Sequence, residues 1–254
     1  MLNFYWYNFS SQLSAQQITE QINDMCERTV QYKRMEEIML FVCVPTVSLE
    51  AVCSAVEDRE LVKICSQCLC PGKITGMPSP HQLKAIGAHA GMTGLADRRY
   101  LCGETDEFCR DGIRELLTLG MKGLLCVGEN KQMKLDGSAG QVIGRQVSVG
   151  LSEVPADAVY RMGIMYRPMW EFEGECTELD YALDMIEIIK QASMKTLPDL
   201  PEPLPVFYGG DISTQKLTEL FQKQVIDGVF VDGDRMSSDE FVHLIDSVQA
   251  YFRS

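Results

Sequence analysis

Apolar and polar residues follow two kinds of pattern along this chain. Short apolar runs of strand length, each bounded by Gly, Pro or polar residues, occur at residues 38–44, 61–65, 123–127, 162–166, 205–209 and 228–231. Weaker runs at residues 4–7 and 91–95 bring the expected strands to eight. Between the runs, apolar residues recur at helical spacing in segments 14–32, 106–120 and 177–195. The pattern predicts repeated strand–helix units.

Eight such units in 254 residues favour a (β/α)8 barrel over a doubly wound sheet, because about 250 residues is the usual size of that barrel. The proline-rich stretch "LPDLPEPLP", residues 197–205, is either a linker between domains or a surface loop. A new apolar run follows it at once, which favours the surface loop. We therefore expect one α/β domain that spans residues 1–254.

Charge and hydropathy limit the partners of this chain. Its formal net charge of −13 and its pI near 4.7 oppose association with nucleic acid and with anionic lipid, since both are polyanions. The N-terminal stretch "MLNFYWYNFS" lacks the basic segment of a signal peptide, and no run reaches the roughly 18 to 20 apolar residues that span a bilayer. We expect a cytoplasmic protein that binds neither nucleic acid nor membrane.

The ten cysteines allow a disulfide framework, a metal site or simple packing. A chain of this length can build a core without disulfides, and Cys43, Cys65 and Cys126 lie inside apolar runs. The motif "CSQCLC" could hold a metal, but no second cluster supplies further ligands at a usual spacing. Reduced, packed thiols and no metal are the prediction.

Five motifs at the ends of the apolar runs have a familiar order. They are "TGLADRRYLCGETDEF" (93–108), "LGMKGLLCVGE" (119–129), "YRPMW" (166–170), "VFYGGDIS" (206–213) and "DGVFVDGD" (227–234). Together they resemble the triosephosphate isomerase family over essentially the whole chain. The resemblance implies a homodimeric TIM barrel that interconverts two triose phosphates without a cofactor, with its site at the C-terminal ends of the strands.

The catalytic positions of that family carry other residues here. The resemblance places Arg167 where the family has its glutamate base, Leu95 where it has its histidine, and Tyr7, which follows Trp6, where it has its lysine. A guanidinium cannot accept a proton at neutral pH, leucine has no donor, and neutral tyrosine stabilises an anion poorly. Three histidines remain as alternatives, and all are expected at surface or structural positions: His81, His89 and His243.

The two loops that bind phosphate in the family keep glycines but gain acids. Anion sites of this kind use backbone N–H groups without an opposing negative charge. Asp211 stands in place of a serine, and Asp232 stands in place of a glycine. We therefore expect a phosphodianion to be rejected. The candidate ligand-binding residues of the mouth are Asp97, Arg167, Gly209, Gly210, Asp211, Asp232, Gly233 and Asp234.

The segment after Trp170 resembles the family's lid over the phosphate. It comprises Glu171, Phe172, Glu173 and Gly174. Its carboxylates either oppose an anion at the mouth or are solvated charges that suit the start of the next helix. In a separate loop, Thr75 and Gly76 match the tip that inserts into the neighbouring subunit in the family, so a homodimer is expected.

Three hypotheses of function follow. The first is a non-catalytic homologue that serves as a binding or regulatory protein, since the chemistry and the phosphate site are lost together. The second is an enzyme of altered chemistry that acts on a non-phosphorylated or metal-bound ligand at the same mouth. The third is a residual isomerase with displaced catalytic groups. Fold resemblance alone does not choose between them.

Overall fold

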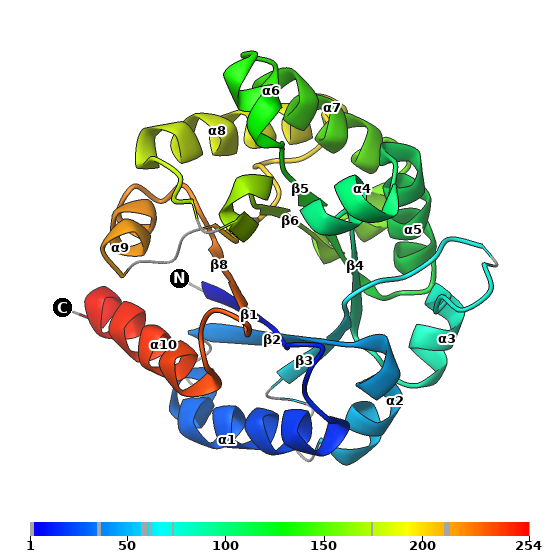
Figure 1. Ribbon diagram of the computed structural model, residues 1–254, viewed down its shortest axis with the longest axis vertical. Coiled ribbons are helices and arrows are strands. Elements are labelled where there is room, and N and C mark those ends of the chain that lie inside the picture. Colours follow the sequence, from blue (N-terminus) through cyan, green and yellow to red (C-terminus); the bar gives the residue numbers. More distant parts are fainter. Residues whose placement is uncertain are drawn as a thin grey trace.

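Eight parallel strands close into a barrel, in the order β1 to β8, in the computed structural model of this chain (Figure 1). The structure describes residues 3–34, 37–56, 60, 62–72, 74–173, 175–210 and 214–253. The strands are β1 (Asn3–Asn8), β2 (Ile38–Val44), β3 (Val62–Ser66), β4 (Ala90–Thr93), β5 (Lys122–Val127), β6 (Met162–Tyr166), β7 (Val206–Tyr208) and β8 (Gly228–Asp232). The predicted single-domain (β/α)8 TIM barrel is confirmed.

Helices surround the barrel on its outside (Figure 1). They are α1 (Ala15–Arg34), α2 (Thr46–Ala55), α3 (Pro80–Ala85), α4 (Ala96–Cys102), α5 (Asp106–Thr118), α6 (Lys131–Leu135), α7 (Ala139–Leu151), α8 (Leu179–Thr196), α9 (Thr214–Gln222) and α10 (Ser238–Arg253), with 3-10 helices η1 (Ala156–Arg161) and η2 (Met169–Glu173). The predicted helices correspond to α1, α5 and α8. Residues 197–205 connect α8 to β7 as an irregular loop, as predicted.

The strand expected at residues 91–95 ends earlier in the structure than the sequence predicts. β4 ends at Thr93, and Gly94 has a left-handed φ of 82° that turns the chain into α4. A left-handed φ is easily adopted only by glycine, because it has no Cβ. Leu95 therefore precedes α4 as its N-cap residue.

Both faces of the strands are buried, which explains their continuous apolar runs. In β2, Leu40 and Val42 pack in the layer between barrel and helices, whereas Phe41 and Cys43 pack in the barrel interior. Side chains alternate between the two faces of a strand, so each run must be apolar at every position to satisfy both layers.

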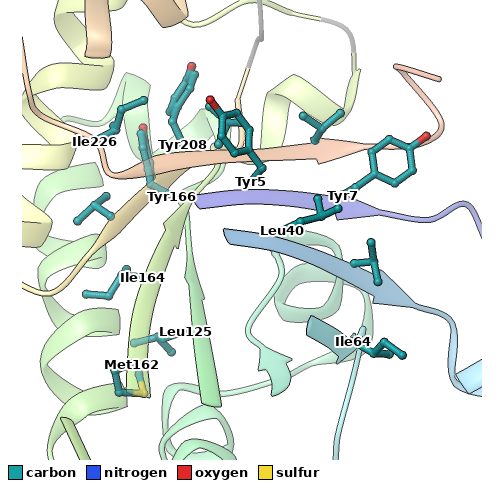
Figure 2. Close-up of a cluster of buried hydrophobic side chains, with 14 of the residues drawn as sticks. Tyr5, Tyr7, Leu40, Ile64, Leu125, Met162, Ile164, Tyr166, Tyr208 and Ile226 are labelled. Atoms are coloured by element: carbon teal, nitrogen blue, oxygen red, sulfur yellow. The ribbon is translucent and has the colours of Figure 1, made fainter. Parts of the chain in front are cut away.

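The same alternation fixes the direction of the aromatic side chains of β1. Tyr5 and Tyr7 belong to the layer between barrel and helices, where both lie against Phe241 of α10, and Figure 2 shows these tyrosines among the buried side chains of that layer. Trp6 belongs to the interior layer and stacks on Phe41. Trp6 and Tyr7 therefore face opposite sides of the barrel wall.

None of the ten cysteines, all of which lie within the described residues, forms a disulfide; seven of them are buried, and Cys102 and Cys176 are exposed. The residues of "CSQCLC" do not converge: Cys65 packs in the interior layer, and the Cys68 Sγ lies 3.2 Å from the Thr46 hydroxyl. Within the residues that the structure describes, no three His, Cys, Asp or Glu side chains are placed to hold a metal ion. Nor does any helix in that part of the chain have the length and hydropathy to cross a membrane.

Candidate ligand site at the barrel mouth

Polar side chains from four strand ends form one hydrogen-bonded chain across the C-terminal mouth of the barrel. Arg167, after β6, pairs with Asp232 at the end of β8 with 2.9 Å between Nη1 and Oδ2. The Asn8 amide at the end of β1 donates to the other oxygen of Asp232 at 3.4 Å. The Gln67 amide, after β3, donates to the Asn8 Oδ1 at 2.9 Å. The mouth is therefore occupied by groups that satisfy one another.

Arg167 is held in place by the loop that follows β5. Its backbone N–H donates to the Val127 carbonyl at 3.0 Å, and the Met169 N–H donates to the Glu129 carbonyl at 2.8 Å. Between them, a Cβ at Gly128 would lie 1.9 Å from the Arg167 carbonyl oxygen, so only glycine fits there. With the side chain of Arg167 only 3% exposed, its charge is fixed inside the mouth.

A cavity of ≈ 150 Å³ lies beside the Arg167–Asp232 pair. Its lining includes Gly209, Gly210 and Arg235. Arg235 and Asp234 are both exposed, and Arg235 forms no ion pair with any residue that the structure describes. Of the predicted ligand-binding residues, Arg167, Gly209, Gly210 and Asp232 line this cavity. Asp211 lies outside the described residues.

Backbone N–H groups of the loops after β7 and β8 already have acceptors. The Gly209 N–H donates to the Tyr166 carbonyl at 2.9 Å, and the Gly233 N–H donates to the Asn8 carbonyl at 2.8 Å. The N–H groups of Arg235 and Met236 both donate to the Asp232 carbonyl, at 2.9 and 3.1 Å. An anion in this cavity would meet few free backbone donors.

Tyr7, which the resemblance places at the family's lysine position, does not stand at the mouth in this structure. It packs behind β1, and its hydroxyl donates to the Met236 carbonyl at 2.8 Å. Burial, followed by the carboxylates of Asp232, Asp234 and Glu240, raises the pKa of Tyr7 to about 12. The side chain of Asn8, one residue later, reaches the mouth instead.

Asn8 and Gln67 are the mouth residues that the sequence analysis missed. Both are polar and come at or directly after the end of an apolar run. In β1, however, four consecutive aromatic residues, from Phe4 to Tyr7, hide which positions face inward. The signal for mouth residues that the sequence did offer was the polar residue at the end of each apolar run, because sites in this fold lie at the C-terminal ends of the strands.

Leu95 and Asp97 lie at the side of the mouth near α4. Leu95 belongs to the interior apolar layer, which agrees with the expected absence of a donor at that position. The carboxylate of Asp97 accepts a hydrogen bond from the Arg98 N–H at 2.9 Å, and Asp97 is not part of the cavity lining. Beside them, the Gly94 N–H donates to Glu104 at 2.9 Å, and Glu104 pairs with Arg98 at 2.5 Å. These contacts hold the loop after β4.

The start of the expected lid is packed into the protein. Met169–Glu173 form η2, in which Trp170 and Glu171 are fully buried. The Tyr208 hydroxyl donates to the Glu171 carboxylate at 3.2 Å, so this carboxylate is not a solvated charge. The side chains of Phe172 and Glu173, and Gly174 as a whole, lie outside the described residues.

A second buried carboxylate, Glu129, joins the loop after β5 to α8. It accepts hydrogen bonds from the Tyr166 hydroxyl at 3.2 Å and from the Tyr181 hydroxyl at 2.9 Å. Burial raises the pKa of Glu129, while the tyrosine hydrogen bonds oppose that shift. Lys134 lies 4.4 Å from the centre of the Tyr181 ring. Glu129 thus has a structural position behind the mouth.

An eight-stranded parallel barrel with polar groups gathered at its C-terminal mouth defines a (β/α)8 protein whose site is built by the loops after the strands. Residues 4–248 match the model of the triosephosphate isomerase family, and the chain belongs to that family.

Curated relatives agree with this assignment. The chain is 30% identical over 209 residues to a triosephosphate isomerase of Chloroflexus aurantiacus, a match that covers 80% of this chain and 83% of that protein. It is 32% identical over 203 residues to the triosephosphate isomerase of Chlorobium luteolum, with 78% and 80% covered. It is 26% identical over 243 residues to a triosephosphate isomerase of Lactobacillus delbrueckii subsp. bulgaricus, a match that covers 94% of this chain and 95% of that protein.

Proposed function

We propose that this chain is a triosephosphate isomerase homologue that does not isomerise triose phosphates and instead serves as a binding or regulatory protein. The observation that carries the proposal is the buried Arg167–Asp232 ion pair at the mouth. Arg167 supplies a permanent cation where the family reaction needs a proton acceptor, and a guanidinium stays protonated at all physiological pH values.

The other side chains of the mouth support this proposal. Leu95 presents an apolar side chain where the reaction needs a group that polarises a carbonyl. Asn8 donates to Asp232 and accepts from Gln67, so the Asn8 amide dipole already stabilises an existing carboxylate. A substrate oxygen at this place would have to displace those bonds.

Electrostatics at the mouth also support it. The Asp232 carboxylate borders the cavity, and neighbouring backbone N–H groups are already bonded. A phosphodianion would be repelled by the carboxylate and would find few backbone donors, and Arg235 would be the cation of the lining left to attract it. Chemistry and substrate binding are therefore both disfavoured at this site.

The test is an assay of glyceraldehyde phosphate isomerisation with protein purified from a host that lacks its own isomerase. We expect no turnover above that of a mock purification, because loss of one catalytic group typically costs about 100- to 10,000-fold in rate. A turnover of about 10 per second that copurifies with this chain, and that falls in Arg167→Ala and Asp232→Asn, would overturn the proposal.

We also propose that the chain forms a homodimer through the face around Thr75 and Gly76. Both are exposed, and three large apolar side chains on nearby elements are exposed as well: Val47 at 91%, Ile74 at 52% and Leu101 at 76%. A contiguous exposed apolar patch marks a surface that a partner covers, and the proposal takes these three side chains as parts of one such patch.

Light scattering after size exclusion tests the dimer. The parent should elute as a dimer, and Val47→Asp combined with Leu101→Asp should give a folded monomer. Leu135→Asp is the matched control, since Leu135 is similarly exposed on α6. A monomeric parent, or a dimer that both variants leave intact, would refute this interface.

A second candidate function is an enzyme of altered chemistry, acting on a non-phosphorylated or metal-bound ligand. The ≈ 150 Å³ cavity beside Arg167 and Arg235 favours it, since it leaves room for a small molecule. Crystals soaked with glycerol phosphate, or with divalent cations, would distinguish the candidates. An ordered cation beside Asp232 supports altered chemistry, and bound phosphate supports a residual isomerase.

A further inference from the structure

The opposite end of the barrel contains a larger cavity, of ≈ 230 Å³. Its lining comes from the first residues of β1, β2, β5 and β6 and from the residues around the start of β7, so it opens at the N-terminal end. Arg167 and Asp232 lie at the other end. An engineered apolar cavity of about 150 Å³ binds benzene in another protein, so this one can admit a ring with a substituent.

Aromatic side chains form the wall of this N-terminal cavity. Trp6 stacks on Phe41 with 3.9 Å between ring centres and 12° between planes, and Phe4 lies 5.4 Å from Phe207. Trp6 is buried, and among the described residues its indole N–H has no hydrogen-bond acceptor. A buried N–H without an acceptor is costly, so Trp6 has a donor that the described residues do not satisfy.

Two cations border the same cavity. Lys122 and Arg161 both line it, and neither forms an ion pair with any residue that the structure describes. Burial, followed by the charges of Lys63 and Arg161, lowers the pKa of Lys122. The buried Nε of Arg161 likewise has no partner in the described part of the chain. In a chain of net charge −13, unpaired cations at an aromatic cavity favour an anionic ligand.

We propose that this cavity binds a small aromatic carboxylate, with its ring against Trp6, Phe41 and Phe207 and its carboxylate on Lys122 and Arg161. Aromatic rings prefer aromatic walls in stacked or tilted geometry, and a carboxylate matches the donors of a guanidinium. A phosphate ester of a sugar fits less well, because its hydroxyl groups would lie against the aromatic walls without polar partners. The site is separate from the mouth and does not depend on the function proposed there.

The Trp6 indole provides a direct measurement. Trp6 and Trp170 are the two tryptophans of the chain, so Trp170→Phe leaves a single indole N–H resonance in a ¹⁵N spectrum. We expect phenylacetate to shift that resonance in a saturable manner with a Kd of about 1 mM, which is ordinary for so small a ligand. The neutral analogue 2-phenylethanol should bind at least about tenfold more weakly, because it lacks the charge.

Variants of the two cations test the placement of the carboxylate. Lys122→Met and Arg161→Met keep much of the side chain but remove the charge, and each should weaken phenylacetate binding by about tenfold or more. Binding of 2-phenylethanol should not change. Lys122→Arg should retain binding, and Lys195→Met is the control, since Lys195 is exposed on α8.

Three results would overturn the proposal. One is the absence of a saturable shift up to about 10 mM phenylacetate. Another is equal affinity in the parent and in both methionine variants that remain folded by circular dichroism. The last is an equal loss in Lys195→Met, which would mean that net charge alone attracts the ligand.

Discussion

The two ends of the barrel differ in how their polar groups are satisfied. At the C-terminal mouth, Arg167, Asp232 and Asn8 bond to one another. At the N-terminal end, Lys122 and Arg161 form no ion pair with the described residues. A ligand at the mouth must break existing bonds before it gains new ones, whereas a ligand at the other end would supply missing partners.

This difference shows that charged groups at one end of the barrel do not by themselves give that end the capacity to bind a ligand. Barrels of this class build their sites at the C-terminal ends of the strands, and the hydrogen bond between Gly94 and Glu104 holds one loop at that end here. At its centre lies the ion pair between Arg167 and Asp232. The predictions below change one side of this comparison at a time.

The largest effect is expected from Arg167→Glu. It places a second carboxylate beside Asp232 in a buried position, and loss of one partner of a buried pair already costs about 3 to 5 kcal/mol in free energy of unfolding. Urea unfolding should show Arg167→Glu less stable than Arg167→Met, and Arg167→Met with Asp232→Asn should recover part of the loss. No isomerisation should appear in Arg167→Glu. Parent-like stability in that variant would show that the pair is not buried in solution.

A second change should convert the mouth into an anion site. Asp232→Gly removes the partner of Arg167, and Asp211→Ser restores a hydroxyl at a residue that lies outside the described part of the structure. Calorimetry at matched ionic strength should show phosphate binding to the double variant with a Kd in roughly the millimolar range, and none to the parent.

The control for this gain is Asp234→Ser, which removes an exposed acid outside the cavity lining. It should leave phosphate binding undetectable. Equal affinity in the parent and the double variant would mean that the two acids do not exclude the anion.

A smaller effect concerns pH. Burial raises the pKa of Glu129, so the unfolded chain releases this proton at a lower pH than the folded chain does. Its contribution to stability is therefore present below the ordinary carboxyl pKa and is lost as the pH rises through the raised value. Glu129→Gln cannot ionise, so its stability should fall less than that of the parent between about pH 4 and 8.

Urea midpoints at several pH values measure this difference. The control is Glu187→Gln, which changes an exposed glutamate of α8 and should leave the pH dependence as in the parent. Identical curves for the parent and Glu129→Gln would mean that the carboxylate of Glu129 is already ionised and well stabilised by Tyr166 and Tyr181.

The smallest effect is expected from Tyr7→Phe. It removes the hydrogen bond to the Met236 carbonyl at a cost of about 1 kcal/mol. The pKa of Tyr7 is raised to about 12, so the parent should lose stability as the pH rises from the ordinary tyrosine range toward that value, and the variant should not. Tyr7→Phe should leave ligand binding at the mouth unchanged, whereas Asn8→Ala should change it. A mouth defect in Tyr7→Phe would contradict its outward position.

The barrel could be predicted from the sequence because its strands are buried on both faces. Runs such as residues 38–44 and 162–166 are apolar at every position, and their number and spacing indicate the closed sheet. The prediction that Arg167 stands where the family has its base also came from the sequence, since Arg167 precedes "PMW" in a distinctive motif. Its pairing with Asp232 comes from the structure.

Other features depend on the direction of side chains, which composition does not encode. β1 presents aromatic residues on both faces, so Tyr7 and Asn8 could not be assigned to inside or outside. Glu171 was expected in an exposed lid, because an acid beside other acids is usually solvated. Its burial depends on Tyr208, which lies 37 residues away in the sequence.

The cysteines are distributed so that the reactivity of their thiols reports the opening of the barrel. Cys102 and Cys176 are exposed, whereas Cys43 and Cys126 lie inside the barrel, where burial raises the pKa of both thiols well above the ordinary value. An alkylating reagent attacks the thiolate, so the interior residues react only when the barrel opens. Intact mass spectrometry would therefore resolve molecules that carry two or three labels from those that carry many. The relative populations over time give the rate and cooperativity of opening under native conditions.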